Sequence, residues 1–149
     1  MNIEILIPTL AGRERYLEWC LKSCLVQRHH SFGILVSNNG GASSVKKLVE
    51  SFNDSRIRYI EVTDLLPMCK HWEFMLSHAK GDFLTIIGDD DAIMPKALLV
   101  VEEVLAEYPG TACVTHEPAQ YYWPDYPVEE LKDRYVYRGR TGIRKLASA

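Results

Sequence analysis

The sequence lacks the glycine-rich motifs with which two large classes of enzyme hold nucleotides. No G-x-x-x-x-G-K-[S/T] occurs, and no G-x-G-x-x-G follows the first apolar run. These absences argue against a P-loop enzyme and against a dinucleotide-dependent oxidoreductase. The serine elbow G-x-S-x-G is missing as well.

Long apolar runs and an excess of basic charge are also missing. No stretch is apolar for long enough to span a bilayer, and the N-terminus lacks the basic start and apolar core of a signal peptide. The net charge of −3 gives no reason to expect nucleic acid as a partner. The four cysteines form no C-x-x-C pair, so we expect reduced core thiols in a cytoplasmic protein.

Apolar runs and helical spacings alternate along the chain. The pattern predicts strands over 2–7, 32–37, 57–62, 82–87 and 111–115, and helices over 14–27, 43–52, 68–78 and from about 96 to 107. This alternation is typical of an α/β fold with a mostly parallel sheet and helices on both faces. We expect the first strand to be central, the third to lie nearer an edge, and the fourth to be buried on both faces.

An acidic stretch follows the fourth predicted strand. Gly88 is followed by three consecutive aspartates, Asp89, Asp90 and Asp91, and Pro95 comes shortly before the next helix. A divalent cation would relieve the repulsion among crowded carboxylates, which are the hard ligands that Mg²⁺ or Mn²⁺ prefers. A solvated acidic turn without a ligand is the alternative.

Two other stretches should lie near these aspartates. Pro8-Thr9-Leu10 follows the first predicted strand, and Ser37-Asn38-Asn39-Gly40 follows the second. Because the carboxyl ends of parallel strands share one edge, the three stretches should converge on one crevice. Hydroxyl, amide and carboxylate groups together suit a nucleotide, although Asn-Asn-Gly-Gly alone is an ordinary turn sequence.

The ordered set of these stretches resembles family 2 glycosyltransferases, which have the Rossmann-like GT-A fold. The resemblance covers about the first hundred residues and rests on I-L-I-P-T from Ile5, L-V-S-N-N-G from Leu35, A-K-G-D-F-L from Ala79 and the three aspartates. It implies a nucleotide-diphospho-sugar donor, a divalent metal (Mn²⁺ or Mg²⁺) bound by a DxD motif, and a glycan, lipid or protein acceptor. The pathway would be the biosynthesis of a polysaccharide, lipopolysaccharide or other glycan.

The resemblance also implies roles for individual residues. The donor would be bound by a set drawn from all three stretches and two basic positions: Pro8, Thr9, Leu10, Arg13, Asn38, Asn39, Lys70, Asp89 and Asp90. The metal would be held by Asp91 and Asp89, although anchoring the motif on Pro95 pairs Asp91 with Asp90 instead. The catalytic general base is not identified.

The chain departs from the family pattern at three positions of the donor site. The usual base-contacting aspartate is replaced by asparagine at Asn38–Asn39, and an amide can donate as well as accept, which leaves the base open. Leu10 stands where an aromatic residue is frequent. The family's basic residue before the long helix has no clean match, with Lys70, His71 and Arg13 as the candidates.

The C-terminal part of the sequence has a different composition. Residues 117–127 are rich in aromatic residues and proline, and residues 128–149 are charged and only weakly periodic. We expect residues 1–116 to form a nucleotide-sugar-binding domain, and 117–149 to begin an incomplete acceptor region of a longer enzyme. The aromatic cluster of Tyr121, Tyr122, Trp123 and Tyr126 would either close the crevice or mediate self-association as a homo-oligomer.

Two other functions fit the same pattern. A nucleotidyltransferase acting on sugar phosphates uses a similar sheet and metal carboxylates, but usually has a glycine-rich loop where this chain has only Gly12. A non-catalytic module that binds nucleotide sugars is the other alternative.

Overall fold

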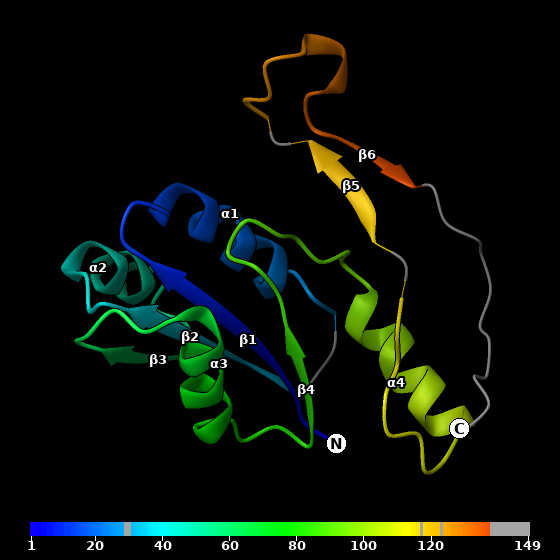
Figure 1. Ribbon diagram of the computed structural model, residues 1–149. Helices are drawn as coiled ribbons and strands as arrows, with labels where there is room; N and C mark the ends of the chain where they lie inside the picture. Colours follow the sequence, from blue (N-terminus) through cyan, green and yellow to red (C-terminus); the bar gives the residue numbers. More distant parts are fainter. Residues whose placement is uncertain (29–30, 117, 123, 138–149) are drawn as a thin grey trace. The chain divides into compact units, whose positions relative to one another are not determined.

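A computed structural model describes residues 1–28, 31–116, 118–122 and 124–137. The chain forms two compact units, residues 1–107 and 108–149. The first unit contains a parallel four-stranded sheet in the order β3-β2-β1-β4 (Figure 1), with β1 at Ile3–Leu10, β2 at Phe32–Asn39, β3 at Ile57–Val62 and β4 at Phe83–Ile86. The predicted α/β class, the central first strand and the edge position of the third strand are confirmed.

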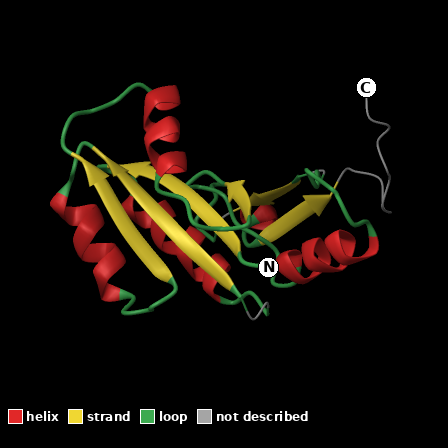
Figure 2. Cartoon of the chain, turned by 90° about the horizontal axis from the view of Figure 1, so that it is seen from below, coloured by secondary structure: helices red, strands yellow, loops and turns green. Residues whose placement is uncertain are grey.

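Helices cover both faces of this sheet, as predicted (Figure 2). They are α1 at Glu14–Leu25, α2 at Ser43–Ser51, α3 at Met68–Ser77 and α4 at Ala97–Glu107. Alternation along β1 divides the core, because successive side chains of a strand point to opposite faces. Ile3, Ile5 and Ile7 pack with residues of α1, α2 and α4, whereas Leu6 packs with Met75 of α3 on the other face.

Two expectations about the strands were wrong. The fourth strand is not buried on both faces, because Leu84 is 44% exposed. Strand β4 also lies at the edge of the sheet, since it pairs only with β1 among the described residues. Residues 111–115 form no strand.

The expectation that the cysteines lie in the core holds for two of the four. All four cysteines are free, and Cys20 and Cys24 are buried on the inner face of α1. Cys69 and Cys113, however, are exposed. The apolar spacing that places a cysteine on a helix's inner face is present only in the first pair.

The second unit contains a small antiparallel sheet. Strand β5 at Ala119–Tyr122 pairs with β6 at Arg134–Tyr137, and the connection includes a 3₁₀ turn at Glu129–Leu131. Strand β5 lies in the aromatic and proline-rich segment 117–127, and β6 lies in the charged segment 128–149. Glu117, Trp123 and residues 138–149, which belong to these two segments, lie outside the described residues.

A buried carboxylate fixes the amino-terminal edge of the large sheet. Glu4 of β1 is 2% exposed, and it accepts hydrogen bonds from the Arg58 guanidinium and from the backbone N–H groups of Lys80 and Gly81. Gly81 is required there, because a Cβ would lie 2.7 Å from the Cβ of Glu4. Burial raises the pKa of Glu4, but the hydrogen bonds from Lys80, Arg58 and Gly81 outweigh it and hold the pKa below 4.5.

Glu4→Gln is expected to remove part of the pH dependence of stability. A folded-state pKa below the unfolded value stabilises the chain above about pH 4.5, and this contribution is lost as pH falls through the folded pKa. The amide also turns a donor toward Arg58, so the variant should lose roughly 2 kcal/mol at pH 7. Urea denaturation at pH 7 and pH 3.5 measures both effects. An equal loss at both pH values would contradict this account.

Candidate functional site

The carboxyl edge of the sheet is built largely from strand residues. Both β1 and β2 continue beyond their predicted ends, so Thr9 pairs with Asn38 and Leu10 with Asn39 in the parallel register. Thr9 and Asn38 are buried, whereas Leu10 is 41% exposed. The ladder thus holds in fixed register two stretches that the sequence placed in loops. Pro8 is half-buried in the same strand.

The three aspartates lie in a tight turn after β4. The Asp91 carboxylate accepts from the Gly88 N–H at 2.9 Å, and the Asp91 N–H donates to the Gly88 carbonyl at 3.1 Å. A Cβ on Gly88 would lie 2.8 Å from Oδ1 of Asp90, so a larger residue at position 88 would displace that carboxylate. The turn brings all three carboxyl groups together, but it gives each a different set of partners.

Asp89 joins the three segments that meet at this edge. It is 4% exposed, and one carboxylate oxygen accepts from the Thr9 hydroxyl at 2.7 Å. The guanidinium of Arg13 binds both of its oxygens, through Nε at 2.7 and 2.8 Å and through Nη2 at 2.7 Å. Both oxygens of Asp89 are therefore satisfied within the chain.

Arg13 also contacts the second aspartate. Its Nη2 lies 2.8 Å from Oδ2 of Asp90, whose side chain is 55% exposed. The hydrogen bond with Asp89 raises the pKa of Arg13 above its ordinary value, so this cation is present at any ordinary pH. A fixed positive charge therefore offsets part of the acidic turn's charge.

The two asparagines of β2 have different environments. Asn39 binds the backbone of Leu66 in the loop before α3, donating to its carbonyl at 2.9 Å and accepting from its N–H at 2.8 Å. Asn38 donates to the Ala42 carbonyl and to the Tyr59 hydroxyl. The side-chain oxygen of Asn38 is buried and has no hydrogen-bond partner among the described residues.

The structure separates the two basic candidates on α3. Lys70 is exposed and pairs with Glu73 one turn further along the helix. His71 is buried, and its Nε2 lies 2.8 Å from the Ser37 hydroxyl at the end of β2. Burial lowers the pKa of His71, which makes it a neutral structural residue at neutral pH. Of the three basic candidates, Arg13 is the one that contacts the acidic turn.

The residues of the turn suit a metal ion that is coordinated partly by the protein and partly by a bound ligand. They suit less well a site in which the protein alone supplies the coordinating groups. No group of three or more His, Cys, Asp or Glu side chains is arranged to hold a metal within the described ranges. In the contacts described above, Asp90 and Asp91 each use only one carboxylate oxygen to contact the rest of the chain. Mg²⁺-type ions are commonly held by one or two carboxylates together with substrate phosphates, and these two residues fit that pattern.

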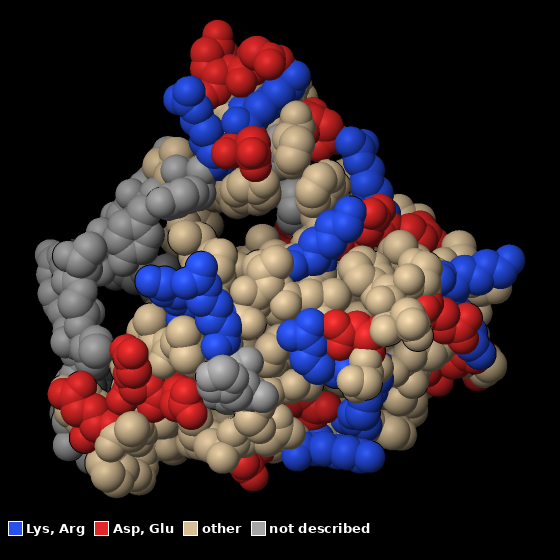
Figure 3. Space-filling model, turned by 180° about the vertical axis from the view of Figure 1, so that it is seen from behind, with Lys and Arg blue, Asp and Glu red and all other residues tan. Residues whose placement is uncertain are grey.

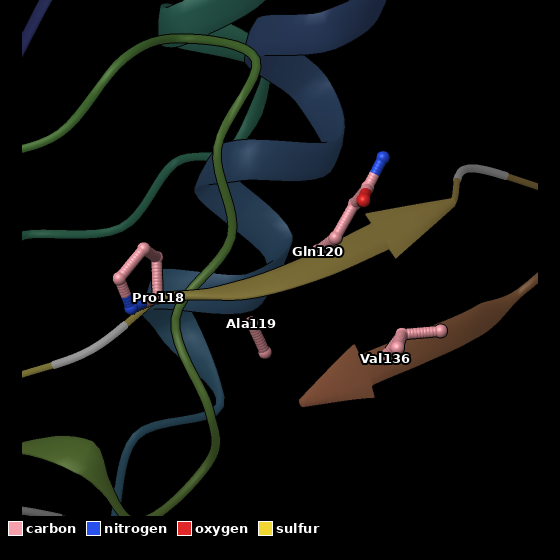
Figure 4. Close-up of a pocket in the computed structure, with 4 residues that line it drawn as sticks. All are labelled: Pro118, Ala119, Gln120 and Val136. Carbon is pink, nitrogen blue, oxygen red and sulfur yellow. The ribbon is translucent and has the colours of Figure 1, made fainter. Parts of the chain in front are cut away.

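The second unit has a hollow of a different character. About 260 Å³ of space is lined by Pro118, Ala119, Gln120 and Val136, and among these described residues Gln120 is the only one with a polar side chain (Figure 4). Tyr122 is 9% exposed, and its ring packs edge-on against that of Tyr126, with 4.7 Å between the ring centroids.

Acidic and basic residues are interspersed on the face shown in Figure 3, without a broad basic area. No helix within the described ranges is long and apolar enough to cross a membrane.

A family profile and a curated relative match the chain. The glycosyl transferase family 2 profile matches residues 4–147. Glycosyltransferase GlyA of Streptococcus pneumoniae serotype 4 (strain ATCC BAA-334 / TIGR4) is 26% identical over 116 residues, which are 76% of this chain and 16% of GlyA. The chain thus spans a small part of that relative's length.

Solved structures share the fold. S. aureus TarS 1–349 in complex with UDP-GlcNAc has a TM-score of 0.66 at 19% identity, covering 80% of this chain and 39% of the other. The mannosyltransferase PcManGT from Pyrobaculum calidifontis, in complex with GDP-Man and Mn²⁺, has a TM-score of 0.62 at 19% identity, covering 76% and 35%. The residues that the family profile matches, 4–147, include the whole edge described above, and the resemblance found in the sequence is confirmed. The chain belongs to glycosyl transferase family 2.

Proposed function

We propose that the chain binds the nucleotide-diphospho-sugar donor of a glycosyltransferase at the carboxyl edge of its sheet. One observation carries the proposal: the Thr9–Asp89–Arg13 contacts tie the end of β1, the loop before α1 and the acidic turn into one polar cluster. In open α/β sheets, ligands bind at this edge. The relatives that were solved with UDP-GlcNAc and with GDP-Man and Mn²⁺ support it.

The residues of the edge take distinct roles in this proposal. Asn38 lies where the base is expected, and Arg13 and Asp90 lie where the diphosphate is expected. Asp91, with Asp90, would hold a divalent cation, whereas Asp89 positions Thr9 and Arg13. When bound, the cation would neutralise part of the charge that develops on the leaving nucleoside diphosphate. Pro8, Leu10, Asn39 and Lys70 remain proposed donor contacts on the strength of the resemblance.

The transfer itself needs a general base that deprotonates the acceptor hydroxyl. No residue of this chain is assigned that role. Among the acidic residues after α4, Asp133 accepts from the Tyr121 hydroxyl and Glu129 pairs with Lys132. The chain spans 20–42% of the length of its TarS relatives. A donor-binding module without turnover is the second proposed function. Release of nucleoside diphosphate from a sugar donor, with a broad acceptor panel, distinguishes catalysis from binding alone.

Calorimetry with a panel of nucleoside diphosphates, with and without Mn²⁺, tests donor binding. At least one nucleotide is expected to bind, and Mn²⁺ should strengthen it. Arg13→Ala should weaken that binding, because it removes the cation beside Asp90. Lys22→Ala is the matched control, since Lys22 is a cation of α1 that pairs with Glu18. Absence of binding by every nucleotide, with the fold intact, would contradict the proposal.

A further inference from the structure

The unpartnered oxygen of Asn38 requires an explanation. Buried polar atoms in native proteins nearly always have a hydrogen-bond partner, so an exception points to a missing water or ligand. Among the described residues, Oδ1 of Asn38 is the only buried side-chain nitrogen or oxygen without one. It belongs to a fully buried residue at the carboxyl end of β2, between Thr9 of β1 and Glu61 of β3 in the register.

The hydrogen atoms around Asn38 can be assigned without ambiguity. Its Nδ2 donates to the Ala42 carbonyl at 2.9 Å and to the Tyr59 hydroxyl oxygen at 2.8 Å. The single proton of Tyr59 is donated to Oε2 of Glu61 at 2.6 Å. An ionised carboxylate only accepts hydrogen bonds. The series Asn38–Tyr59–Glu61 therefore runs in one direction, from amide to hydroxyl to carboxylate.

Two features keep this direction fixed. Burial, together with the hydrogen bond to Glu61, raises the pKa of Tyr59 to about 12, so its hydroxyl keeps its proton. The Ala42 carbonyl also accepts only, and a flipped amide would place oxygen against oxygen there. Consequently both N–H groups of Nδ2 are used in hydrogen bonds within the chain. The amide cannot flip, so Oδ1 remains available only as an acceptor.

The same geometry explains why asparagine is suitable here. An aspartate at position 38 would face the Ala42 carbonyl and would compete with Glu61 for the one proton of Tyr59. Asparagine supplies two donors to those neighbours and still leaves an acceptor. The amide thus offers its ligand the same chemistry as a carboxylate oxygen, without the charge.

We propose that Tyr59 and Glu61 are positioning residues that make Asn38 an acceptor-only reader of the donor's base. This inference rests on the proposed function, and it names the class of base. The base must present a ring N–H, as uracil and thymine do at N3 and guanine at N1. Cytosine and adenine present an unprotonated ring nitrogen at the corresponding position. The nucleotides bound to the TarS and PcManGT relatives, UDP-GlcNAc and GDP-Man, both contain bases of the first class.

Contact with the base requires a local opening. Asn38 has no exposed surface. Its side chain points to the opposite face of the sheet from that of Asn39, because the two are neighbours on one strand. The segment that follows β2, from Gly40 to Ala42, lies against Asn38 through the Ala42 carbonyl. A shift of this segment is the opening that the inference requires.

The test compares each nucleoside diphosphate with its ring-N-methylated form by calorimetry, namely UDP with 3-methyl-UDP and GDP with 1-methyl-GDP. For whichever base binds, methylation should weaken binding about tenfold or more, because it removes the N–H and leaves Oδ1 unpaired. Asn38→Ala should bring the ratio of the two dissociation constants close to one. CDP or ADP binding as tightly as the best nucleotide would overturn the inference, as would equal affinities for the methylated and unmethylated forms.

Tyr59→Phe tests the positioning role. If Tyr59 orients Asn38, the methylation ratio should fall several-fold in the variant, whereas a merely structural tyrosine would leave the ratio unchanged. The matched control is Tyr121→Phe, which removes another tyrosine–carboxylate hydrogen bond, to Asp133, and should preserve the ratio.

A compensating pair of substitutions tests the direction of the hydrogen bonds. Asn38→Asp should lower the melting temperature, and adding Glu61→Gln should restore part of it, because the Tyr59 proton can then turn to position 38. Adding Glu103→Gln, an exposed carboxylate of α4, should restore none. Additive effects of Asn38→Asp and Glu61→Gln would refute the series. Failure of all nucleotides to bind would instead refute the proposed function, and the two failures are therefore distinguishable.

Discussion

Asp91→Ala is expected to abolish the metal-dependent part of donor binding while leaving the fold almost as stable as before. In the structure, the Asp91 carboxylate accepts one hydrogen bond, from the N–H of Gly88, in an exposed turn. Loss of such a bond costs about 1 kcal/mol, and relief of repulsion from its two neighbours offsets part of that cost. The large effect should therefore appear in the binding isotherm measured with Mn²⁺, because Asp91 is the proposed metal ligand.

Paired measurements separate this role from a structural one. Thermal melts and calorimetry with and without Mn²⁺ should be made on the same preparation of Asp91→Ala. Glu103→Ala, which removes an exposed negative charge from α4, should change neither. If Asp91 served only to hold the turn, the variant would lose stability and keep the same increase in affinity on adding Mn²⁺. That outcome would remove Asp91 from the proposed metal site.

Asp89→Ala, in contrast to Asp91→Ala, is expected to lower the stability of the fold strongly. Asp89 is buried, and its removal leaves the Thr9 hydroxyl and the Arg13 guanidinium without their acceptor. Breaking such a network typically costs about 3 kcal/mol, less than for a fully buried pair because the Arg13 side chain is one-third exposed. We expect a matching loss in the free energy of unfolding, even without any ligand.

Denaturant titration of the apo protein checks this expectation. Asp90→Ala is the appropriate comparison, since it also removes a carboxylate that contacts Arg13, but from an exposed position. That variant should cost about 1 kcal/mol or less. Equal losses for Asp89→Ala and Asp90→Ala would show that the contacts of Asp89 with Thr9 and Arg13 do not stabilise the fold.

The sequence predicted the architecture of the first unit because its signals are local. The spacing of Leu17, Cys20, Leu21 and Cys24 alone locates the inner face of α1, and all four are buried. Exposure of β4 was not predictable in the same way. An apolar run such as Phe83–Ile86 carries no information about whether other elements cover both of its faces, and Leu84 is 44% exposed.

The sequence also predicted which residues would lie at the edge, but not their partners. The parallel topology was sufficient to bring Thr9, Asn38 and Asp89 to one side of the sheet. The hydrogen bonds to Asp89 depend on the path of the loop that carries Arg13, which has no periodic pattern. Tyr59 was missed for a related reason. Its hydroxyl reaches Asn38 diagonally on the neighbouring strand, and the sequence of β3 carries no signal of that contact.

Amide-detected NMR on the ¹⁵N-labelled 149-residue chain, titrated with Mn²⁺ in the presence of its tightest-binding nucleoside diphosphate, tests the central claim most directly. Paramagnetic broadening should be strongest in the turn from Gly88 to Asp91 and extend to the end of β1 and the following loop. It should be absent in Asp91→Ala. Broadening centred on another part of the chain, or nucleotide binding that shifts no resonance at this edge, would contradict the proposed donor site.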